Sequence, residues 1–118
     1  MTTNIIGSCG EDIAAEYLED KDYEILERNY SFKFGEIDII AEKDGCTVFV
    51  EVKTRRSRRY GSPAEYVDFR KQRRIKRVAA CYRDIVNDDV RFDIVEVIYS
   101  EHDGHFEITD INHIENAF

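Results

Sequence analysis

The sequence is poor in residues that interrupt or cross-link a chain. Its 118 residues include one proline, six glycines and three cysteines. No Pro/Gly/Ser-rich stretch marks a linker, so we expect one domain over residues 1–118. With 42% apolar and 12% aromatic residues, a chain of this length can bury a compact core.

The three cysteines are scattered and odd in number, as Cys9, Cys46 and Cys81, with no CxxC pair. They favour neither a disulfide framework nor a structural zinc site, and predict buried reduced thiols. No apolar run approaches the roughly 18 residues that cross a bilayer, and the first residues lack the pattern of a signal peptide. We therefore expect a cytoplasmic protein without a membrane partner.

Acidic residues exceed basic ones, and the net charge of −8 would on average repel a polyanion. The basic residues are nevertheless concentrated, because residues 53–77 hold eleven of the seventeen Lys and Arg residues and only two acidic ones. That segment carries +9 and the remainder −17. The clustering indicates phosphate binding, and the alternative is a basic face that neutralises the protein's own acidic surface. The residues that we assign to nucleic-acid binding are Arg55, Arg56, Arg58, Arg59, Lys71, Arg73, Arg74 and Arg77.

Hydrophobic periodicity predicts two helices. Residues 9–21 place apolar side chains on one helical stripe, with Ser8 as the N-cap and Glu11 three residues later. Residues 62–65 have the form of a capping box with proline at the first helical position, and the helix can restart at Asp68. The apolar stripe of this second helix consists of Ile75, Val78, Ala79, Tyr82 and Val86.

Strand-like segments fill most of the remaining chain. Asp44-Gly45 lies between two of them and is a strong hairpin signal, and residues 102–105 are better explained as a turn than as a histidine metal site. The order is α-β-β-β-α-β plus a C-terminal appendage, which predicts an α/β domain with a mixed central sheet flanked by helices. The predicted strands are residues 23–32, 35–42, 46–53, 90–99 and 105–111, with a basic loop at 54–61.

The predicted hairpin places two carboxylates opposite one another. If Asp44 and Gly45 are the central turn residues, the numbers of paired residues sum to 89, so Asp38 faces Glu51. Like charges at opposed positions, with Cβ atoms about 4.5–5.5 Å apart, are destabilising. A bound Mg²⁺ explains them, because this ion prefers oxygen ligands.

The register also assigns a function to each face of the hairpin. Lys53 projects from the same face as Glu51 and can orient the attacking water or stabilise the transition state. The opposite face is wholly apolar from Ile37 to Val52, so one face is expected to be core and the other to carry charge. The alternative is a surface strand whose polar face happens to carry these side chains.

Further polar residues are expected to point inward from the helices. Glu11 lies at the edge of the apolar stripe of the first helix, where it can reach the sheet. Lys71 and Gln72 extend the inward stripe of the second helix, and inward polar groups need partners. A role at the site explains them, as does a position at an exposed end where they reach water.

Short motifs distributed over nearly the whole chain carry a resemblance to a known family. They include Gly35-Glu36-Ile37-Asp38, the run from Val48 to Arg55, Lys71-Gln72, Arg91-Phe92-Asp93 and Asn116-Ala117-Phe118. On these motifs the sequence resembles the YraN-like family of small bacterial proteins, which is grouped with PD-(D/E)XK nucleases and Holliday-junction resolvases.

The resemblance implies a restriction-endonuclease-like core with Mg²⁺ or Mn²⁺ held between Asp38 and Glu51. It makes Lys53 the catalytic lysine and matches Glu11 to the helix-borne acidic residue of resolvase-like members. With Gln72 as a further candidate, these are the expected catalytic residues.

Three functions are compatible with this pattern. The first is a metal-dependent endonuclease acting on DNA, including branched or recombination intermediates, for which a symmetric junction would favour a C2 homodimer. The second is a nucleic-acid-binding module of the same fold that does not cut, and the third is a protein-interaction domain. The opposed carboxylates favour the first, because a pure binder has no chemical need for them.

Overall fold

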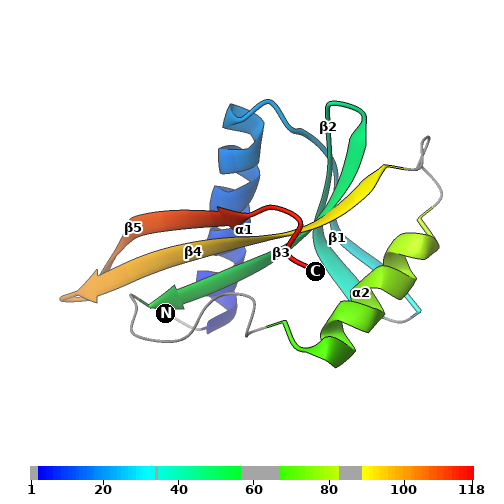
Figure 1. Ribbon diagram of the computed structural model, residues 1–118. Helices are drawn as coiled ribbons and strands as arrows, with labels where there is room; N and C mark the ends of the chain where they lie inside the picture. Colours follow the sequence, from blue (N-terminus) through cyan, green and yellow to red (C-terminus); the bar gives the residue numbers. More distant parts are fainter. Residues whose placement is uncertain (1–2, 34, 57–66, 83–88) are drawn as a thin grey trace.

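The computed structural model describes residues 3–33, 35–56, 67–82 and 89–118, with side chains described from Cys9 onward. The elements follow the predicted α/β order, α-β-β-β-α-β, and a further strand completes a five-stranded mixed sheet (Figure 1). The elements are α1 (Thr3–Asp20), β1 (Glu24–Phe32), β2 (Gly35–Lys43), β3 (Cys46–Arg56), α2 (Phe69–Ala80), β4 (Val90–His102) and β5 (His105–Ile114).

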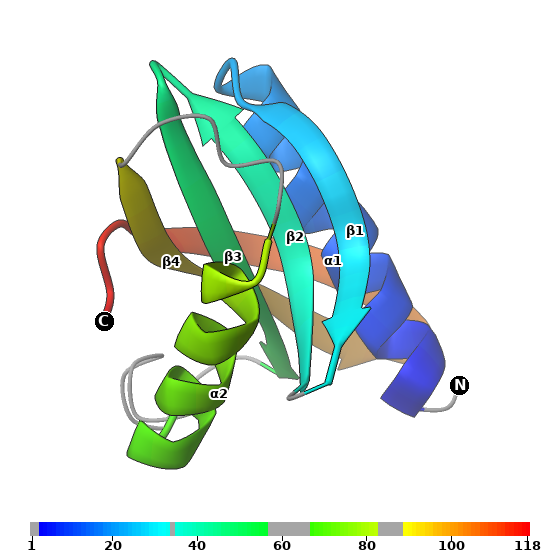
Figure 2. The ribbon, with the colours of Figure 1, turned by 90° about the vertical axis from the view of Figure 1, so that its right-hand side faces the viewer.

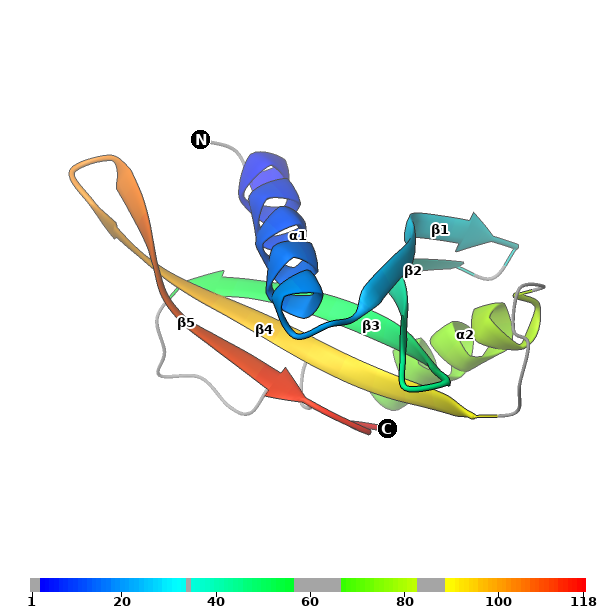
Figure 3. The same ribbon diagram turned by 90° about the horizontal axis from the view of Figure 1, so that it is seen from above.

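The five strands lie in the order β1-β2-β3-β4-β5. Neighbouring strands are antiparallel except β3 and β4, which are parallel, and α2 belongs to the connection between them. A parallel pair requires such a crossover. The hairpin of β4 and β5 extends past α1 when the molecule is seen from above (Figure 3).

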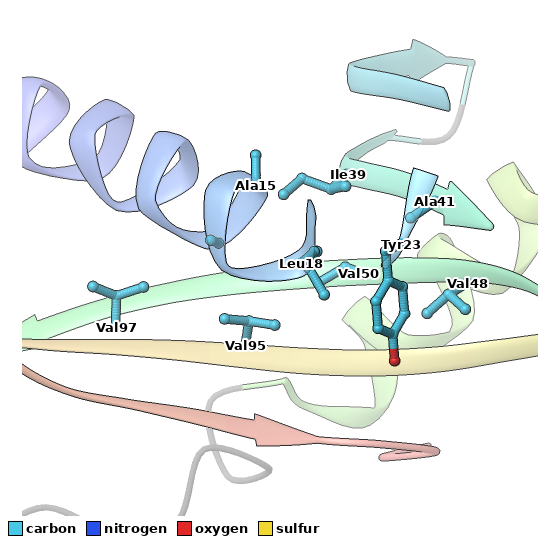
Figure 4. Close-up of a cluster of buried hydrophobic side chains, with 10 residues drawn as sticks. Ala15, Leu18, Tyr23, Ile39, Ala41, Val48, Val50, Val95 and Val97 are labelled. Carbon is cyan, nitrogen blue, oxygen red and sulfur yellow. The ribbon is translucent and has the colours of Figure 1, made fainter. Parts of the chain in front are cut away.

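Two apolar clusters pack on opposite faces of the sheet, one beneath each helix (Figure 2). The first joins Leu18 of α1 to residues such as Val50 and Val95 (Figure 4). The second joins Ile75 of α2 to Phe49 and its neighbours. The prediction of one apolar and one charged face of the hairpin is therefore wrong, because α2 covers the second face with apolar contacts. Charged side chains remain on that face only near the end of the helix.

Ile37 also departs from the predicted alternation. It is 1% exposed and belongs to the cluster under α2, not to the one under α1. Its partner across the sheet, Tyr30, packs against the same cluster. The simple two-residue period does not describe this end of β2.

The first helix begins earlier than the sequence predicts. It starts at Thr3, so Ser8 lies within the helix and is not its N-cap. Gly10 does not break the helix, and a Cβ added to it would lie 1.9 Å from Thr54 Oγ1. Glycine is needed here because α1 approaches β3 closely.

The second helix has the predicted cap but is shorter. Asp68 is the N-cap, and its carboxylate accepts a hydrogen bond from the Lys71 N–H at 2.9 Å. The helix ends at Ala80, where the Cys81 N–H bonds to the Val78 carbonyl, so Tyr82 packs into the core from beyond the helix. The predicted capping box at 62–65 and Val86 lie outside the described residues.

Both predicted turns are confirmed. Asp44 and Gly45 have φ angles of 51° and 80°, and Asp103 and Gly104 have 51° and 81°. Positive φ at both central positions is the conformation of a type I′ turn, which suits a two-residue hairpin.

The strands β2 to β5 run further than predicted, whereas β1 begins one residue later than predicted. β3 continues to Arg56 because its pairing with β4 continues to Arg56 and Tyr99, so residues 54–56 are strand and not loop. β4 and β5 likewise extend to the turn between them, and β5 is the edge strand as expected.

Cysteine burial differs from the prediction. The three thiols are free, but Cys9 is exposed and the other two are only partly buried. Among the residues that the structure describes, no helix is long and apolar enough to cross a membrane.

Candidate functional site

The candidate site lies where β2 and β3 stop pairing. The predicted register is confirmed from the turn to Ile39 and Val50, one position before Asp38 and Glu51. At that point Asp38 Oδ2 accepts a hydrogen bond from the Val52 N–H at 2.8 Å. The backbone ladder is thus replaced by a side-chain contact that fixes the carboxylate of Asp38.

Asp38 and Glu51 form one electrostatic unit. Burial, followed by the hydrogen bond and charge of Glu51, raises the pKa of Asp38 to about 8, although the Val52 N–H acts in the opposite direction. Glu51 is 4% exposed. Asp38 therefore retains its proton at neutral pH, because burial and the neighbouring Glu51 both oppose a negative charge on this carboxyl group.

Two lysines stand beside this pair. Lys71 Nζ forms an ion pair with Glu51 Oε2; burial lowers its pKa, but the hydrogen bond and charge of Glu51 raise it more, so the net shift is upward. Burial and the positive charge of Lys71 lower the pKa of Lys53, against the pull of both carboxylates. The predicted grouping of Asp38, Glu51 and Lys53 is present, and Lys71 joins it.

The carboxylates open into a cavity of about 240 Å³. Its walls come from the start of β2, the middle of β3 and the first turns of α2, so it lies between the sheet and the basic helix. The cavity is lined by Gly35, Glu36, Asp38, Glu51, Lys71, Arg74 and Ile75.

Glu11 approaches this site without lining the cavity. Burial and the charge of Glu36 raise its pKa, and its own charge contributes to the raised pKa of Asp38. The structure therefore brings Glu11 within electrostatic reach of the pair, as its place on the helical stripe predicts. Among the described residues, no group of three or more His, Cys, Asp or Glu side chains is arranged to hold a metal ion.

Gln72 has a different partner. Its Nε2 donates a hydrogen bond to the Val67 carbonyl at 2.9 Å, and the residue does not line the cavity. This bond supports the segment that leads into α2. A catalytic role for Gln72 remains a prediction.

The predicted cations separate into two groups. Arg55 forms an ion pair with Glu96, whose side chain is fully buried, so it has a structural partner, and its assignment to a nucleic-acid surface stays a prediction. Arg56 lies at the surface in an ion pair with Glu101. Arg73 and Arg74 are exposed on α2, as is Arg77. Arg58 and Arg59 lie outside the described residues.

A second polar network, which was not predicted from the sequence, lies beside Tyr17 and Tyr23 on the face of the sheet that α1 covers. The carboxylate of Asp93 accepts two hydrogen bonds from Arg91, both 2.8 Å long, and lies 2.7 Å from His113 Nε2. It also accepts a bond from the Asn116 N–H at 3.0 Å. The signal was available, because Asp93 and Glu96 are the two acidic residues of the predicted strand 90–99, whose other residues apart from Arg91 are apolar or aromatic.

Comparison with known proteins places the chain among relatives of the same length. The sequence model of UPF0102, described as an uncharacterised protein family, matches residues 10–97. The chain belongs to the UPF0102 family. This agrees with the YraN-like resemblance.

Relatives in the family span the complete chain. A UPF0102 protein of Alkaliphilus metalliredigens is 47% identical over 116 residues, which cover 96% of both chains. UPF0102 proteins of Dictyoglomus turgidum and Caldicellulosiruptor saccharolyticus are 43% and 46% identical over 121 residues, with 100% of both chains covered. The match to UPF0102 therefore includes α1, the carboxylate pair, α2 and the C-terminal network.

Proposed function

We propose that this UPF0102 protein is a metal-dependent endonuclease that acts on DNA. The observation that carries the proposal is the pair of half-buried Asp38 and buried Glu51 at the wall of a cavity whose opposite side is the basic helix α2. A strand end that places two carboxylates together at the cost of repulsion is typical of a site that binds a cation.

The donor set fits Mg²⁺ or Mn²⁺. Asp38 and Glu51 supply hard oxygen ligands, and such ions are commonly held by one or two carboxylates while water and phosphate oxygens complete the shell. The ammonium of Lys71 against Glu51 shows that this position attracts positive charge. When bound, the ion would polarise the phosphodiester and make an attacking water more acidic.

Lys53 has the properties of a residue that can transfer a proton to and from the attacking water. Its ammonium is partly buried beside the carboxylates, and its pKa is lowered by burial and by Lys71. A lysine in this state gives up its proton more readily than one in water, so it can accept and return a proton at the attacking water. When protonated, it stabilises negative charge that develops on the phosphate.

The exposed arginines of α2 provide a surface for the DNA backbone. Arg74 lines the cavity, and Arg73 and Arg77 are exposed on the same helix. They lie in the segment that carries +9 in a chain of net −8. Because DNA is attracted to this region and repelled elsewhere, the field directs the substrate to the carboxylates.

The proposal is tested by cleavage of linear, flapped and four-way DNA in the presence of Mn²⁺ or Mg²⁺. We expect Glu51→Gln and Asp38→Ala to lower the rate by at least about 100-fold, because each removes an oxygen ligand of the ion. Glu42→Gln is the matched control, since Glu42 lies on the same strand near the turn, away from the cavity. Equal rates for wild type and both site variants would overturn the proposal.

The second candidate is a DNA-binding module without nuclease activity. It is favoured by one observation, that no group of three potential metal-binding side chains is formed among the described residues. Such a module would bind DNA with an affinity that falls steeply with salt. It would leave every DNA of the panel uncut at saturating Mn²⁺.

A further inference from the structure

The ion pair between Lys71 and Glu51 joins the basic helix to the carboxylate pair. Lys71 lies in the first turn of α2, where the Asp68 cap fixes its backbone through a 2.9 Å hydrogen bond. Its side chain crosses the cavity wall to Glu51, which is 4% exposed, while 33% of the Lys71 side chain is accessible to solvent. One end of the pair is thus buried and the other reaches the surface.

The atom that Lys71 contacts is an atom that a metal ion would need. Lys71 Nζ lies against Glu51 Oε2, and a divalent ion bound between Asp38 and Glu51 would compete for that carboxylate. An ammonium and a divalent ion bound to the same carboxylate oxygen would lie close together, where their positive charges repel. Binding of the ion therefore requires Lys71 to move away.

We propose that Lys71 is a positioning residue that holds the metal position in the metal-free protein and exchanges with the divalent ion. The inference rests on the proposed function for the identity of the metal ligands. After the exchange the ammonium turns toward the cavity, beside Arg74, and contacts a phosphate of the DNA. Its long and partly exposed stem allows this movement while the helix stays in place.

Exchange gives Lys71 two opposite effects. In the metal-free protein it stabilises Glu51, because a buried carboxylate without a cation is costly. Against a metal ion it competes, so its removal should tighten metal binding. Toward DNA it contributes only after the ion has displaced it, so metal and DNA should strengthen each other's binding through this residue.

The first experiment measures Mn²⁺ alone, by calorimetry or by electron paramagnetic resonance, with no DNA present. We expect Lys71→Met to bind Mn²⁺ about tenfold more tightly than wild type, because a positive charge in direct contact with a ligand is lost. Arg74→Met is the matched control, since Arg74 lines the same cavity and its loss changes net charge equally. It should tighten binding by less than about threefold, as expected for an exposed charge.

The outcomes separate this inference from the proposed function. Equal changes in the two variants would show general electrostatics, and weaker binding by Lys71→Met would show that Lys71 supports the metal site; either result overturns the exchange and leaves the nuclease proposal intact. Absence of Mn²⁺ binding by wild type and both variants would overturn both. Lys71→Gln, with thermal melting to verify folding, repeats the test with a polar side chain.

The second experiment measures the affinity for DNA by fluorescence anisotropy, once with and once without Ca²⁺. It compares Lys71→Met and Arg74→Met with Glu42→Gln, which serves as the reference. We expect the affinity for DNA with Ca²⁺, divided by the affinity without Ca²⁺, to be at least about threefold lower in Lys71→Met than in the reference. This variant lacks the ammonium that the ion would release to contact the DNA. Arg74→Met should weaken DNA binding in both conditions and keep the ratio. An unchanged ratio in Lys71→Met would contradict the exchange.

Discussion

At the scale of single residues, the carboxyl group of Asp38 lies in the candidate site and lowers the stability of the folded protein when it ionises. It is half-buried beside Glu51, and its pKa of about 8 means that ionisation is opposed by the fold. Under the proposed function, this local cost in stability is kept because the acidic pair would bind the metal ion. The conflict between the two carboxylates is therefore a measurable property of the metal-free protein.

Asp38→Asn should stabilise the protein in a pH-dependent way. The raised pKa means that folded Asp38 retains a proton between about pH 4 and 8 while the unfolded chain has released it. The unfolded state then binds fewer protons, so the free energy of unfolding of wild type falls as the pH rises through this window. Asparagine resembles the neutral acid and avoids that loss, so we expect a gain of about 1–3 kcal/mol at pH 8 and little at pH 4.

The measurement is urea unfolding of both proteins across this range without added metal. Asn can still accept the bond from the Val52 N–H that Asp38 accepts, so the variant tests charge and not geometry. Glu42→Gln serves as the control for removal of an acidic group on the same strand. Parallel stability curves for Asp38→Asn and wild type would refute the raised pKa.

At the scale of elements, the approach of α1 to β3 sets where Glu11 lies. Gly10 faces Thr54, and there is no room for a Cβ between them. The next residue on the helix is Glu11, whose charge reaches Asp38. A close helix–strand contact thus brings a carboxylate of α1 toward the site.

Gly10→Ala should therefore lower stability and disturb the site together. The added Cβ would lie 1.9 Å from Thr54 Oγ1 and 3.1 Å from Thr54 Cβ, so α1 or β3 must move. We expect a loss of about 1–3 kcal/mol in the free energy of unfolding, which is typical of overpacking. Adding Thr54→Ala removes the Oγ1 and should restore part of the loss, as a double-mutant cycle by urea unfolding would measure. Strict additivity of the two changes would contradict this explanation.

At the scale of the whole molecule, the C-terminus is tied to the start of β4. The Ala117 N–H donates to the Phe92 carbonyl at 2.6 Å, and the rings of Phe118 and Phe92 stack with their centres 5.5 Å apart. Asp93 and its partners form the polar half of the same junction. The network anchors β5 and the last residues to the sheet that carries the site.

Asp93→Asn should weaken the fold without acting at the site. Burial alone would raise the pKa of Asp93, but the bonds from His113, Arg91 and Asn116 lower it overall. Its contribution to stability is therefore present above about pH 4 and is lost as the pH falls further. Because Asn removes the buried anionic partner of Arg91 and leaves it the exposed Glu115, we expect a loss of about 3–5 kcal/mol at pH 7.

The loss should shrink below about pH 4, because there the unfolded chain binds a proton at Asp93 more readily than the folded protein does. Urea unfolding at pH 7 and pH 3 tests this, with Glu107→Gln as a control because Glu107 is exposed on β5. A loss of equal size at both pH values would show that hydrogen-bond geometry, and not charge, stabilises the junction.

The sequence by itself determined the order of the helices and strands and the register of the hairpin formed by β2 and β3. Asp44-Gly45 predicts a two-residue turn, and such a turn together with the two-residue period leaves one register for the hairpin. That register is observed as far as Ile39 and Val50, and the carboxyl groups of Asp38 and Glu51 meet one position further on. Asp68 likewise marks the start of α2 because a carboxylate suits the free N–H groups of a first turn.

Only the tertiary structure decided which basic side chains contact the carboxylates of the candidate site. Arg55 and Lys71 look equivalent in a basic segment, yet one is neutralised by Glu96 and the other meets Glu51. The parallel pairing of β3 with β4 places Glu96 beside Lys53 in the register, and the packing of α2 on the sheet directs Lys71 inward. Charge partners far apart in sequence depend on these contacts, so local periodicity and composition cannot reveal them.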